Sequence, residues 1–295
     1  MRVSASHVFR QGACIRTLVG VALSAALPKS SRELQCPGPW VERTVKPRHP
    51  RLVTQYIGWS GGHEGSYGVT VPPHLFPQWG FPVLAKALGT LPWPMAKVMN
   101  QGCRIESHHP IPAGEALNIR ARLIDVESSP HKARVHARIE TGTETQPLCM
   151  TADVFMVVPL GKREGGKRAP PLVPEEGRKL LDRTLPKRAG LEFALLTGDF
   201  NPIHWVAPYA KMFGFKGTIL HGFGSMAIAW EAIVASELAG DAERMKWLDV
   251  RFVRPQPLPG KCAVFIAENG NVSMGVEAGA RATMLGTYGV EDANG

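Results

Sequence analysis

The sequence has few cysteines and lacks any long apolar run. Its five cysteines are scattered and form no Cys-x-x-Cys pair, which argues against a zinc site or a disulfide framework and favours small buried or half-buried thiols. No stretch approaches the ~20 apolar residues that a membrane-spanning helix needs. Since 44% of the 295 residues are hydrophobic and 20% are charged, a wholly disordered chain, a coiled coil and a collagen-like repeat are also excluded. We expect a soluble globular protein of one large domain or two smaller ones.

Acidic residues are absent before Glu33, whereas several arginines precede it. A basic segment of this kind, with residues 25–26 as a poor cleavage site, fits a targeting peptide. It fits equally an N-terminal helix over residues 14–27 that ends at Pro28. We interpret residues 1–39 as an N-terminal extension with this helix. The protein is expected to be cytoplasmic, or organellar or exported if the extension targets it.

A segment rich in glycine, proline and charge separates two halves of similar pattern. Residues 161–177 read GKREGGKRAPPLVPEEG, which is typical of a linker. In each half an arginine and an apolar residue precede a Pro-x-Pro corner that ends in glycine. The two patterns begin at Arg104 and Arg251, 147 positions apart. This internal repeat divides the chain into a first half, 40–160, and a second half, 178–295.

Each half is expected to contain one helix followed by antiparallel strands. Apolar residues alternate after both corners, as in half-buried strands. The Asn-Gly pair at 269–270 predicts a hairpin that leads into a strand over 272–278. Helices are predicted over 81–91 and 222–238. The second helix is apolar nearly all round, so a sheet is expected to wrap over it.

Three polar residues, Asp199, Asn201 and His204, crowd into six positions. Because Pro202 disfavours helix at the residue before it, these side chains are expected on a shaped loop where they can converge. Gly222 is expected near a helix N-terminus, where free N–H groups can receive an anion. Taken singly, the same residues also suit a turn, a helix cap and a satisfied core histidine.

These residues carry a resemblance to a known family. Residues 198–204 match the signature Gly-Asp-x-Asn-Pro-[Leu/Ile/Val]-His without a gap, and residues 219–222 match an Ile/Val-x-His-Gly step. The chain resembles the MaoC-like dehydratases, which include the (R)-specific type-2 enoyl-CoA hydratases, over roughly residues 178–290. The resemblance implies an α+β tandem (double) hot-dog fold, in which each unit is a curved antiparallel sheet wrapped around a central helix.

The resemblance also implies an activity. It is the (R)-specific interconversion of trans-2-enoyl and (3R)-3-hydroxyacyl thioesters, on CoA or acyl carrier protein, without metal or organic cofactor. Asp199 and His204 would hold a water molecule, Asn201 would orient it, and the N–H of Gly222 would receive the thioester oxygen. The chemistry needs a base, an acid and an oxyanion donor in any case. An acyl-CoA thioesterase and a non-catalytic acyl-thioester-binding or scaffold subunit are the alternatives.

The first half has no Asp-x-Asn-x-x-His motif, so no second active site is expected there. It resembles the inactive repeat of two-repeat family members, which lodges the acyl chain. Its aromatic residues then either line that pocket or fill the core. The candidate pocket residues are Phe76, Trp79, Phe81 and Trp93.

Basic residues outnumber acidic ones by 34 to 25, which favours anionic partners. Phosphates of CoA or an acidic acyl carrier protein would meet this charge, and no nucleic acid or membrane span is expected. A homodimer of double hot-dogs is a further possibility. The basic residues expected to steer the carrier are Lys211, Lys216, Lys246, Arg251 and Arg254.

Overall fold

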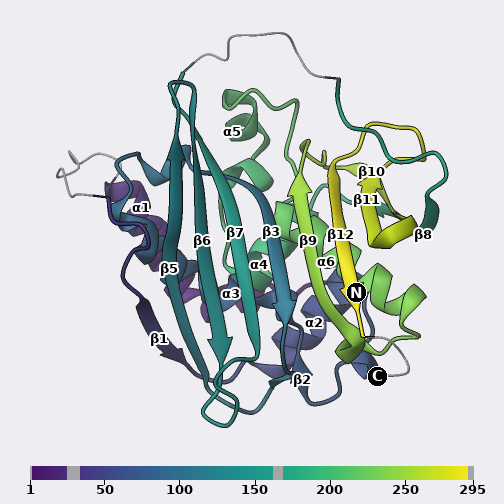
Figure 1. Ribbon diagram of the computed structural model, residues 1–295, viewed down its shortest axis with the longest axis horizontal. Coiled ribbons are helices and arrows are strands. Elements are labelled where there is room, and N and C mark those ends of the chain that lie inside the picture. The colour runs from purple at the N-terminus through teal and green to yellow at the C-terminus, as the bar shows by residue number, and fades with distance from the viewer. Residues whose placement is uncertain (1, 25–33, 162–168, 292–295) are drawn as a thin grey trace.

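The computed structural model describes residues 2–24, 34–161 and 169–291. One antiparallel sheet of ten strands forms the front of the molecule, and the helices lie behind it (Figure 1). In spatial order the strands are β1 (Val41–Val45), β5 (Leu117–Ser128), β6 (Lys132–Gly142), β7 (Met150–Pro159), β3 (Met99–Ser107), β9 (Met245–Phe252), β12 (Met284–Val290), β11 (Asn271–Gly275), β10 (Gly260–Ala267) and β8 (Arg178–Leu185). A small second sheet pairs β2 (Thr70–Val71) with β4 (Ile111–Pro112).

Two central helices are each covered by the strands of their own half. The α-helices are α1 (Gly12–Ser24), α2 (Pro50–Ser60), α3 (Pro77–Ala87), α4 (Ala189–Thr197), α5 (Ala207–Met212) and α6 (Gly222–Glu237). The 3-10 turns are η1 (Ala5–Arg10), η2 (Glu64–Ser66), η3 (Pro73–Leu75), η4 (Leu88–Thr90), η5 (Met95–Lys97), η6 (Pro202–His204), η7 (Ala242–Arg244) and η8 (Glu268–Gly270). Helix α3 packs on β1, β5 and β6, while α6 packs on β8, β9 and β11 and also reaches β3.

The two halves join in the middle of the sheet, where β3 pairs with β9. The register places Cys103 opposite Val250, and these residues are also 147 positions apart. Each is followed by the arginine that begins the repeated pattern, Arg104 or Arg251. If each residue is replaced by its counterpart in the other half, the pairs of this ladder are unchanged. The two halves are therefore related by an approximate two-fold axis at the Cys103–Val250 pair. A curved sheet around a central helix occurs twice, so the predicted tandem hot-dog fold is confirmed.

Helix α6 follows the sequence-based prediction closely, but α3 does not. The helix predicted over 81–91 begins at Pro77 instead and continues through Pro82. Proline has no N–H, so the carbonyl of Gln78 loses its helical donor. The Cys14 thiol lies 3.4 Å from that carbonyl and donates to it. The predicted start is wrong because a residue distant in sequence compensates for the proline.

The predicted strand over 272–278 is too long. Asn269 and Gly270 take the positive φ that the tight turn needs, and β11 then ends at Gly275. A Cβ at Gly275 would lie 2.5 Å from a methyl carbon of Val173. The segment ahead of β8 therefore crosses the sheet here, and Val173 bonds through its N–H to the carbonyl of Ala280 at 2.8 Å. The residues beyond Gly275 turn away from the ladder.

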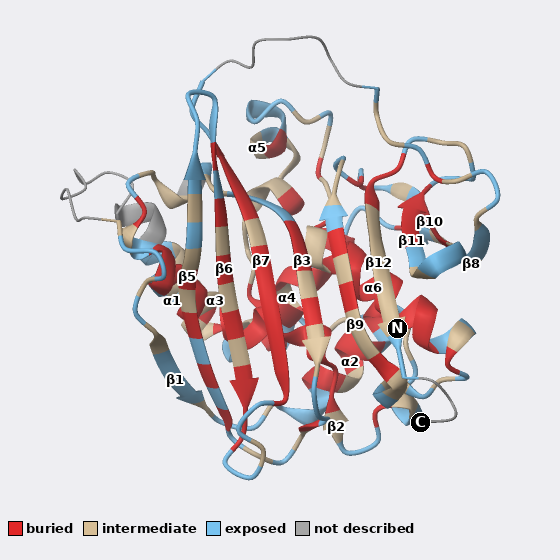
Figure 2. Cartoon of the chain, in the orientation of Figure 1, coloured by how far each residue is buried: buried red, intermediate tan, exposed pale blue. Residues whose placement is uncertain are grey.

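The apolar core is continuous across the two halves (Figure 2). Strand positions alternate between buried and exposed in β5 and β6, whereas most of α6 is buried on every side. All five cysteines are free, and four are buried, but Cys36 is exposed, contrary to expectation. Within the described residues, no helix is both long enough and apolar enough to cross a membrane.

The N-terminal segment is helical where it is described. Helix α1 begins at Gly12, two residues before the predicted start, and is followed to Ser24. The predicted helix end and the candidate cleavage site at 25–26 lie outside the described residues. Ahead of α1, His7 and Gln11 are buried, so this part of the extension belongs to the folded core.

Candidate active site

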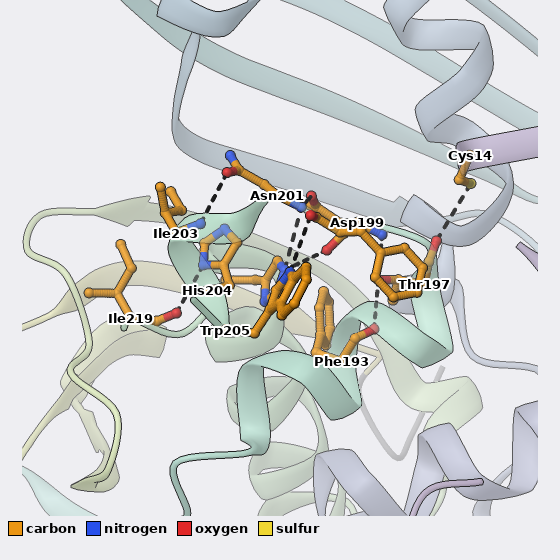
Figure 3. Close-up of polar contacts among 11 residues, drawn as sticks. Cys14, Phe193, Thr197, Asp199, Asn201, Ile203, His204, Trp205 and Ile219 are labelled. Carbon is orange, nitrogen blue, oxygen red and sulfur yellow. Dashed lines mark hydrogen bonds and ion pairs between the residues drawn. The ribbon is translucent and has the colours of Figure 1, made fainter. Parts of the chain in front are cut away.

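The Asp-x-Asn motif lies on a loop whose turns are made by its own side chains (Figure 3). Helix α4 ends at Gly198, which has a left-handed φ of 84°. The carboxylate of Asp199 accepts the N–H of Asn201 at 3.3 Å, and the Asn201 carbonyl oxygen accepts the N–H of Ile203 at 3.3 Å. Such local bonds replace helical backbone bonds and hold a turn. The segment is a shaped loop, as the sequence predicts, and it leads directly into η6.

A second histidine completes the cluster around Asp199 and His204. One ligand atom of each of Asp199, His204 and His221 lies within 4.8 Å of the others. The rings of His204 and His221 stack with centroids 3.5 Å apart. The His221 side chain is 1% exposed and the Asp199 side chain 23%. His221 belongs to the Ile/Val-x-His-Gly step, but the sequence alone gave it no role, because its contacts depend on how two distant segments pack.

The hydrogen bonds fix which ring nitrogens hold protons. Nδ1 of His204 lies 2.9 Å from the carbonyl oxygen of Ile219, and Nε2 of His221 lies 3.0 Å from that of Asp199. Because a carbonyl oxygen only accepts, both nitrogens are N–H donors. Nε2 of His204 has no partner among the described residues and is the nitrogen that can exchange a proton. His221 holds the backbone of Asp199 in place.

Burial sets the protonation of both rings. It lowers the pKa of His204, against a smaller opposing effect from the Asp199 carboxylate. It lowers the pKa of His221 well below its usual range, and the adjacent His204 lowers it further. Both imidazoles are therefore neutral at neutral pH. A neutral His204 presents the Nε2 lone pair, which is the form a general base needs.

The N-terminus of α6 supplies a free backbone donor beside this pair. The first N–H groups of a helix have no acceptor within it, and the N–H of Gly222 finds none elsewhere in the described part of the chain. A Cβ on Gly222 would lie 2.6 Å from two ring carbons of Phe252, so only glycine fits here. Since His221 precedes Gly222 and stacks on His204, the free N–H lies next to the Asp199–His204 pair.

Asp199, His204 and His221 have the composition of a metal site, but their bonding suits water better. Nδ1 of His204 and Nε2 of His221 already donate to backbone carbonyls, and Nδ1 of His221 is buried without a partner. A cation on Nε2 of His221 would have to displace the carbonyl of Asp199. The Asp199 carboxylate and Nε2 of His204 are left, and one water molecule can bridge two groups this close.

The candidate acyl-pocket residues differ in their surroundings. Trp79 is 1% exposed and donates its indole N–H to the hydroxyl of Thr141 at 3.0 Å, which places it in the core of the first half. Phe81 and Trp93 are half-buried. The described contacts therefore support a packing role for Trp79.

Phe76 connects the first half to the candidate site. Its ring packs edge to face on Phe223 at 5.2 Å, and Phe223 lies 6.4 Å from Phe252. Phe223 follows Gly222 directly, and both are half-buried. Neither Phe223 nor Phe252 was identified from the sequence as a site residue. Phe223 directly follows the glycine of the Ile/Val-x-His-Gly step, and this adjacency is the signal that would have found it, whereas Phe252 comes from a distant strand and has no such signal.

The basic residues expected to steer a carrier also lie in different places. Arg251 bonds to Asp249 and lies over the ring of Phe155 at 4.1 Å. Because side chains alternate along a strand, Arg251 points away from the face on which Phe252 meets Gly222. Residues 1–63 hold nine Lys and Arg against two Glu, so most of the net charge lies in the N-terminal extension and at the start of the first half. The residues that remain exposed around the second-half loops are Lys211, Lys216 and Arg254.

The chain is similar to known hydratases and dehydratases. Over 258 residues it is 25% identical to 3-hydroxyacyl-thioester dehydratase X of Mycobacterium tuberculosis, which covers 84% of this chain and 86% of that protein. Over 72 residues, 24% of this chain, it is 38% identical to the peroxisomal enoyl-CoA hydratase 2 of Arabidopsis thaliana. That match spans 23% of the plant enzyme, and a match to a fatty acid synthase β subunit of Emericella nidulans spans 4% of its length.

Solved structures show the same fold. The crystal structure of HtdX from Mycobacterium tuberculosis aligns with a TM-score of 0.68 at 21% identity, covering 84% of this chain and 99% of that one. A second protein of that organism, described as having a double hotdog fold, aligns with a TM-score of 0.54 at 12% identity, covering 87% of this chain and 96% of that one. The family model described as MaoC like domain matches residues 172–284. Residues 172–284, which include most of the second half, are therefore similar to a MaoC-like domain.

Proposed function

We propose that the protein is a hydro-lyase that interconverts trans-2-enoyl and (3R)-3-hydroxyacyl thioesters by adding or removing water. The observation that carries this proposal is the pairing of Asp199 with a neutral His204 beside the free N–H of Gly222. The names of the similar proteins, enoyl-CoA hydratase 2 and 3-hydroxyacyl-thioester dehydratase X, support it. The (R) configuration is taken from the family resemblance.

In the hydration direction, a water molecule lies between the Asp199 carboxylate and Nε2 of His204. As its oxygen forms a bond to C3 of the enoyl group, Nε2 takes one of its protons. The electron pair of the double bond moves toward the thioester oxygen, where the N–H of Gly222 stabilises the negative charge. The protonated Nε2 of His204 then gives this proton to C2, which completes the addition of one water molecule and returns His204 to its neutral form. Dehydration follows the same steps in reverse.

Asn201 has a free group for this chemistry. Its carbonyl oxygen is engaged by the N–H of Ile203, which orients the side chain and leaves its amide N–H groups to donate to the water or the 3-hydroxyl group. A positioned acid or base contributes about 10²–10⁴ in rate, and one oxyanion donor about 10²–10³. These groups together account for a large acceleration without a Lewis acid.

We propose an apolar path for the acyl chain beside the thioester. We place it along Phe223, Phe252 and Phe76, because this connected set begins at Gly222. The carrier, CoA or acyl carrier protein, would then approach from the exposed segment that contains Lys211 and Lys216. Chain length, carrier, compartment and a homodimeric assembly stay predictions.

The test is a set of initial rates with trans-2-enoyl-CoAs of increasing chain length, followed by the loss of enoyl absorbance. We expect turnover by the full-length protein and a (3R) product on a chiral column. Release of free CoA from a saturated acyl-CoA would favour the thioesterase instead. Binding of acyl-CoA without any change in enoyl absorbance would contradict the proposal and favour a scaffold subunit.

A further inference from the structure

The N-terminal segment reaches the back of the candidate active site. We name residues 4–14 the N-terminal brace. Its first part is fixed to the first half, because Gln55 accepts both the backbone N–H of Ser4 and Nε2 of His7 at 2.9 Å. His7 is fully buried. The brace then crosses to the second half, where it meets the end of α4.

Gln11 caps the helix that precedes Asp199. Its side-chain amide donates to the carbonyl oxygens of Leu195 at 2.9 Å and Leu196 at 3.0 Å. The last carbonyls of a helix have no donor within it, so a side chain must satisfy them when they are buried. Gln11 is 1% exposed, and its own oxygen accepts from Gln78 at 3.1 Å. Both ends of the amide are used, which fixes its orientation.

Cys14 continues this support to the loop itself. Its thiol lies 3.7 Å from the carbonyl of Thr197, in addition to its contact with Gln78. A Cβ on Gly198 would lie 2.5 Å from the Cβ of Cys14 and 3.0 Å from Oε1 of Gln11. The backbone of Gly198 therefore packs directly against the brace, and Asp199 is the next residue in the chain. Burial raises the pKa of the Cys14 thiol to about 12, so it acts here as a packed thiol and not as a nucleophile.

We propose that Gln11 is a positioning residue for the reaction, acting through the end of α4 on the Asp199 carboxylate. The brace is then part of the catalytic unit. The proposal rests on the proposed function for its kinetic readout. Cleavage at residues 25–26, one interpretation of the basic N-terminus, would remove Gln11 and Cys14 and leave the carbonyls of Leu195 and Leu196 without their donors.

The test is the variant Gln11→Met in the full-length protein. Methionine keeps the length of glutamine but removes its donors and its acceptor. We expect kcat to fall about 10–100-fold, because a misplacement of about 1 Å at reacting groups costs about 10²-fold. KM should change less than about threefold, since a residue that touches no substrate removes no ground-state binding. Hydrogen exchange of the backbone over residues 195–204 should become faster, and this readout needs no activity.

Thr141→Val is the matched control. It is close in shape and also removes one buried hydrogen bond, to Trp79 in the first-half core, but it does not touch the loop. We expect it to lower the melting temperature while kcat and the exchange of residues 195–204 stay at the wild-type level. If it lowers kcat as much as Gln11→Met does, the effect is general destabilisation and the proposal is overturned.

Two further outcomes decide the remaining cases. Unchanged kcat and unchanged exchange in Gln11→Met would overturn the proposal. If Gln11→Met does not fold, Gln11→Asn, whose shorter amide cannot reach both carbonyls, replaces it with the same expectations. A wild-type protein without hydratase activity would refute the proposed function, whereas the exchange measurement would still decide whether the brace holds the loop.

Discussion

Replacing Gly222 by alanine would test whether its N–H is the oxyanion donor, because the ring of Phe252 leaves no room for a side chain at this position. The new Cβ would lie 2.6 Å from Cδ2 and Cε2 of Phe252 and 2.9 Å from its Cζ. Carbon atoms in contact prefer about 3.5–4.0 Å, so the ring or the backbone must move by roughly 1 Å. Overpacking of this kind costs about 1–3 kcal/mol of stability. A displacement of about 1 Å at the N–H should lower kcat about 10²-fold.

A double-mutant cycle with Phe252→Ala separates this steric effect from other causes. Removing the ring makes room for the methyl group, so Gly222→Ala should lower kcat only about threefold in the Phe252→Ala background, by the logic of coupled neighbouring sites. Phe252→Ala and the double variant both lack the contact of the Phe252 ring with the acyl chain, so the loss of this contact does not change the ratio of their kcat values. The assay is the hydration of crotonyl-CoA and of one longer enoyl-CoA, with melting temperatures recorded for all four proteins.

Two results would refute the reasoning. If Gly222→Ala leaves kcat unchanged although the protein is folded, the N–H of Gly222 is not the donor to the thioester oxygen. If the loss is equally large with and without the Phe252 ring, the steric account is wrong. In the second case the helix N-terminus would have to be sensitive to the substitution for a reason that does not involve Phe252.

Other perturbations also have expected outcomes. Asp199→Asn and His204→Gln should each lower kcat by at least about 10²-fold with unchanged circular dichroism, and the double variant should lose little more, because the two residues act on one water. Burial lowers the pKa of His204 below 6.5, so in acid the unfolded chain binds a proton that the folded chain does not. The free energy of unfolding should therefore be constant above pH 6.5 with respect to this group and decrease as the pH falls below 6.5. The decrease should be smaller in His204→Gln. Glu231→Ala should destabilise by about 1–3 kcal/mol, seen in denaturant titrations, because it removes the buried carboxylate that Tyr67 and His74 share, although these two still bond to each other. Trp79→Ala should cost about 3–5 kcal/mol and slow short and long substrates alike, whereas Phe76→Ala should slow long ones more.

The sequence predicts the central helices and the repeat because both depend on local patterns. Apolar residues around the whole circumference of 222–238 specify a buried helix, and the 147-position offset indicates two similar halves, which the structure joins where Cys103 pairs with Val250. The start of α3 could not be predicted. Pro82 argues locally against a helix, and the thiol that offsets its missing N–H comes from Cys14, far away in sequence.

The candidate site divides in the same way. Asp199, Asn201 and His204 are found from the sequence because they lie on one short loop whose shape is local. His221 and Phe252 reach the site from other segments, so their roles appear only when the sheet and α6 are in place. Gln11 lies farther still from the motif in sequence, and no spacing rule connects it to α4.

The first half has other residues in the place of the Asp-x-Asn motif. Helices α2 and α4 both end at a left-handed glycine, Gly61 with φ 98° and Gly198 with φ 84°, so the loops that follow them are counterparts. The residue after Gly61 is Gly62, in the place of Asp199, and a Cβ there would collide with the carboxylate of Glu231.

That carboxylate comes from α6 of the second half. It lies 3.1 Å from Nε2 of His74 and accepts the hydroxyl of Tyr67 at 3.0 Å. His74 is 147 positions before His221 and, like it, is buried just ahead of a central helix. Where the second half has the partly exposed Asp199, the first half has Gly62, and Glu231 of α6 fills the space. The first-half position that corresponds to Asp199 is thus a fixed contact between the halves, and it holds the helix whose N-terminus presents Gly222.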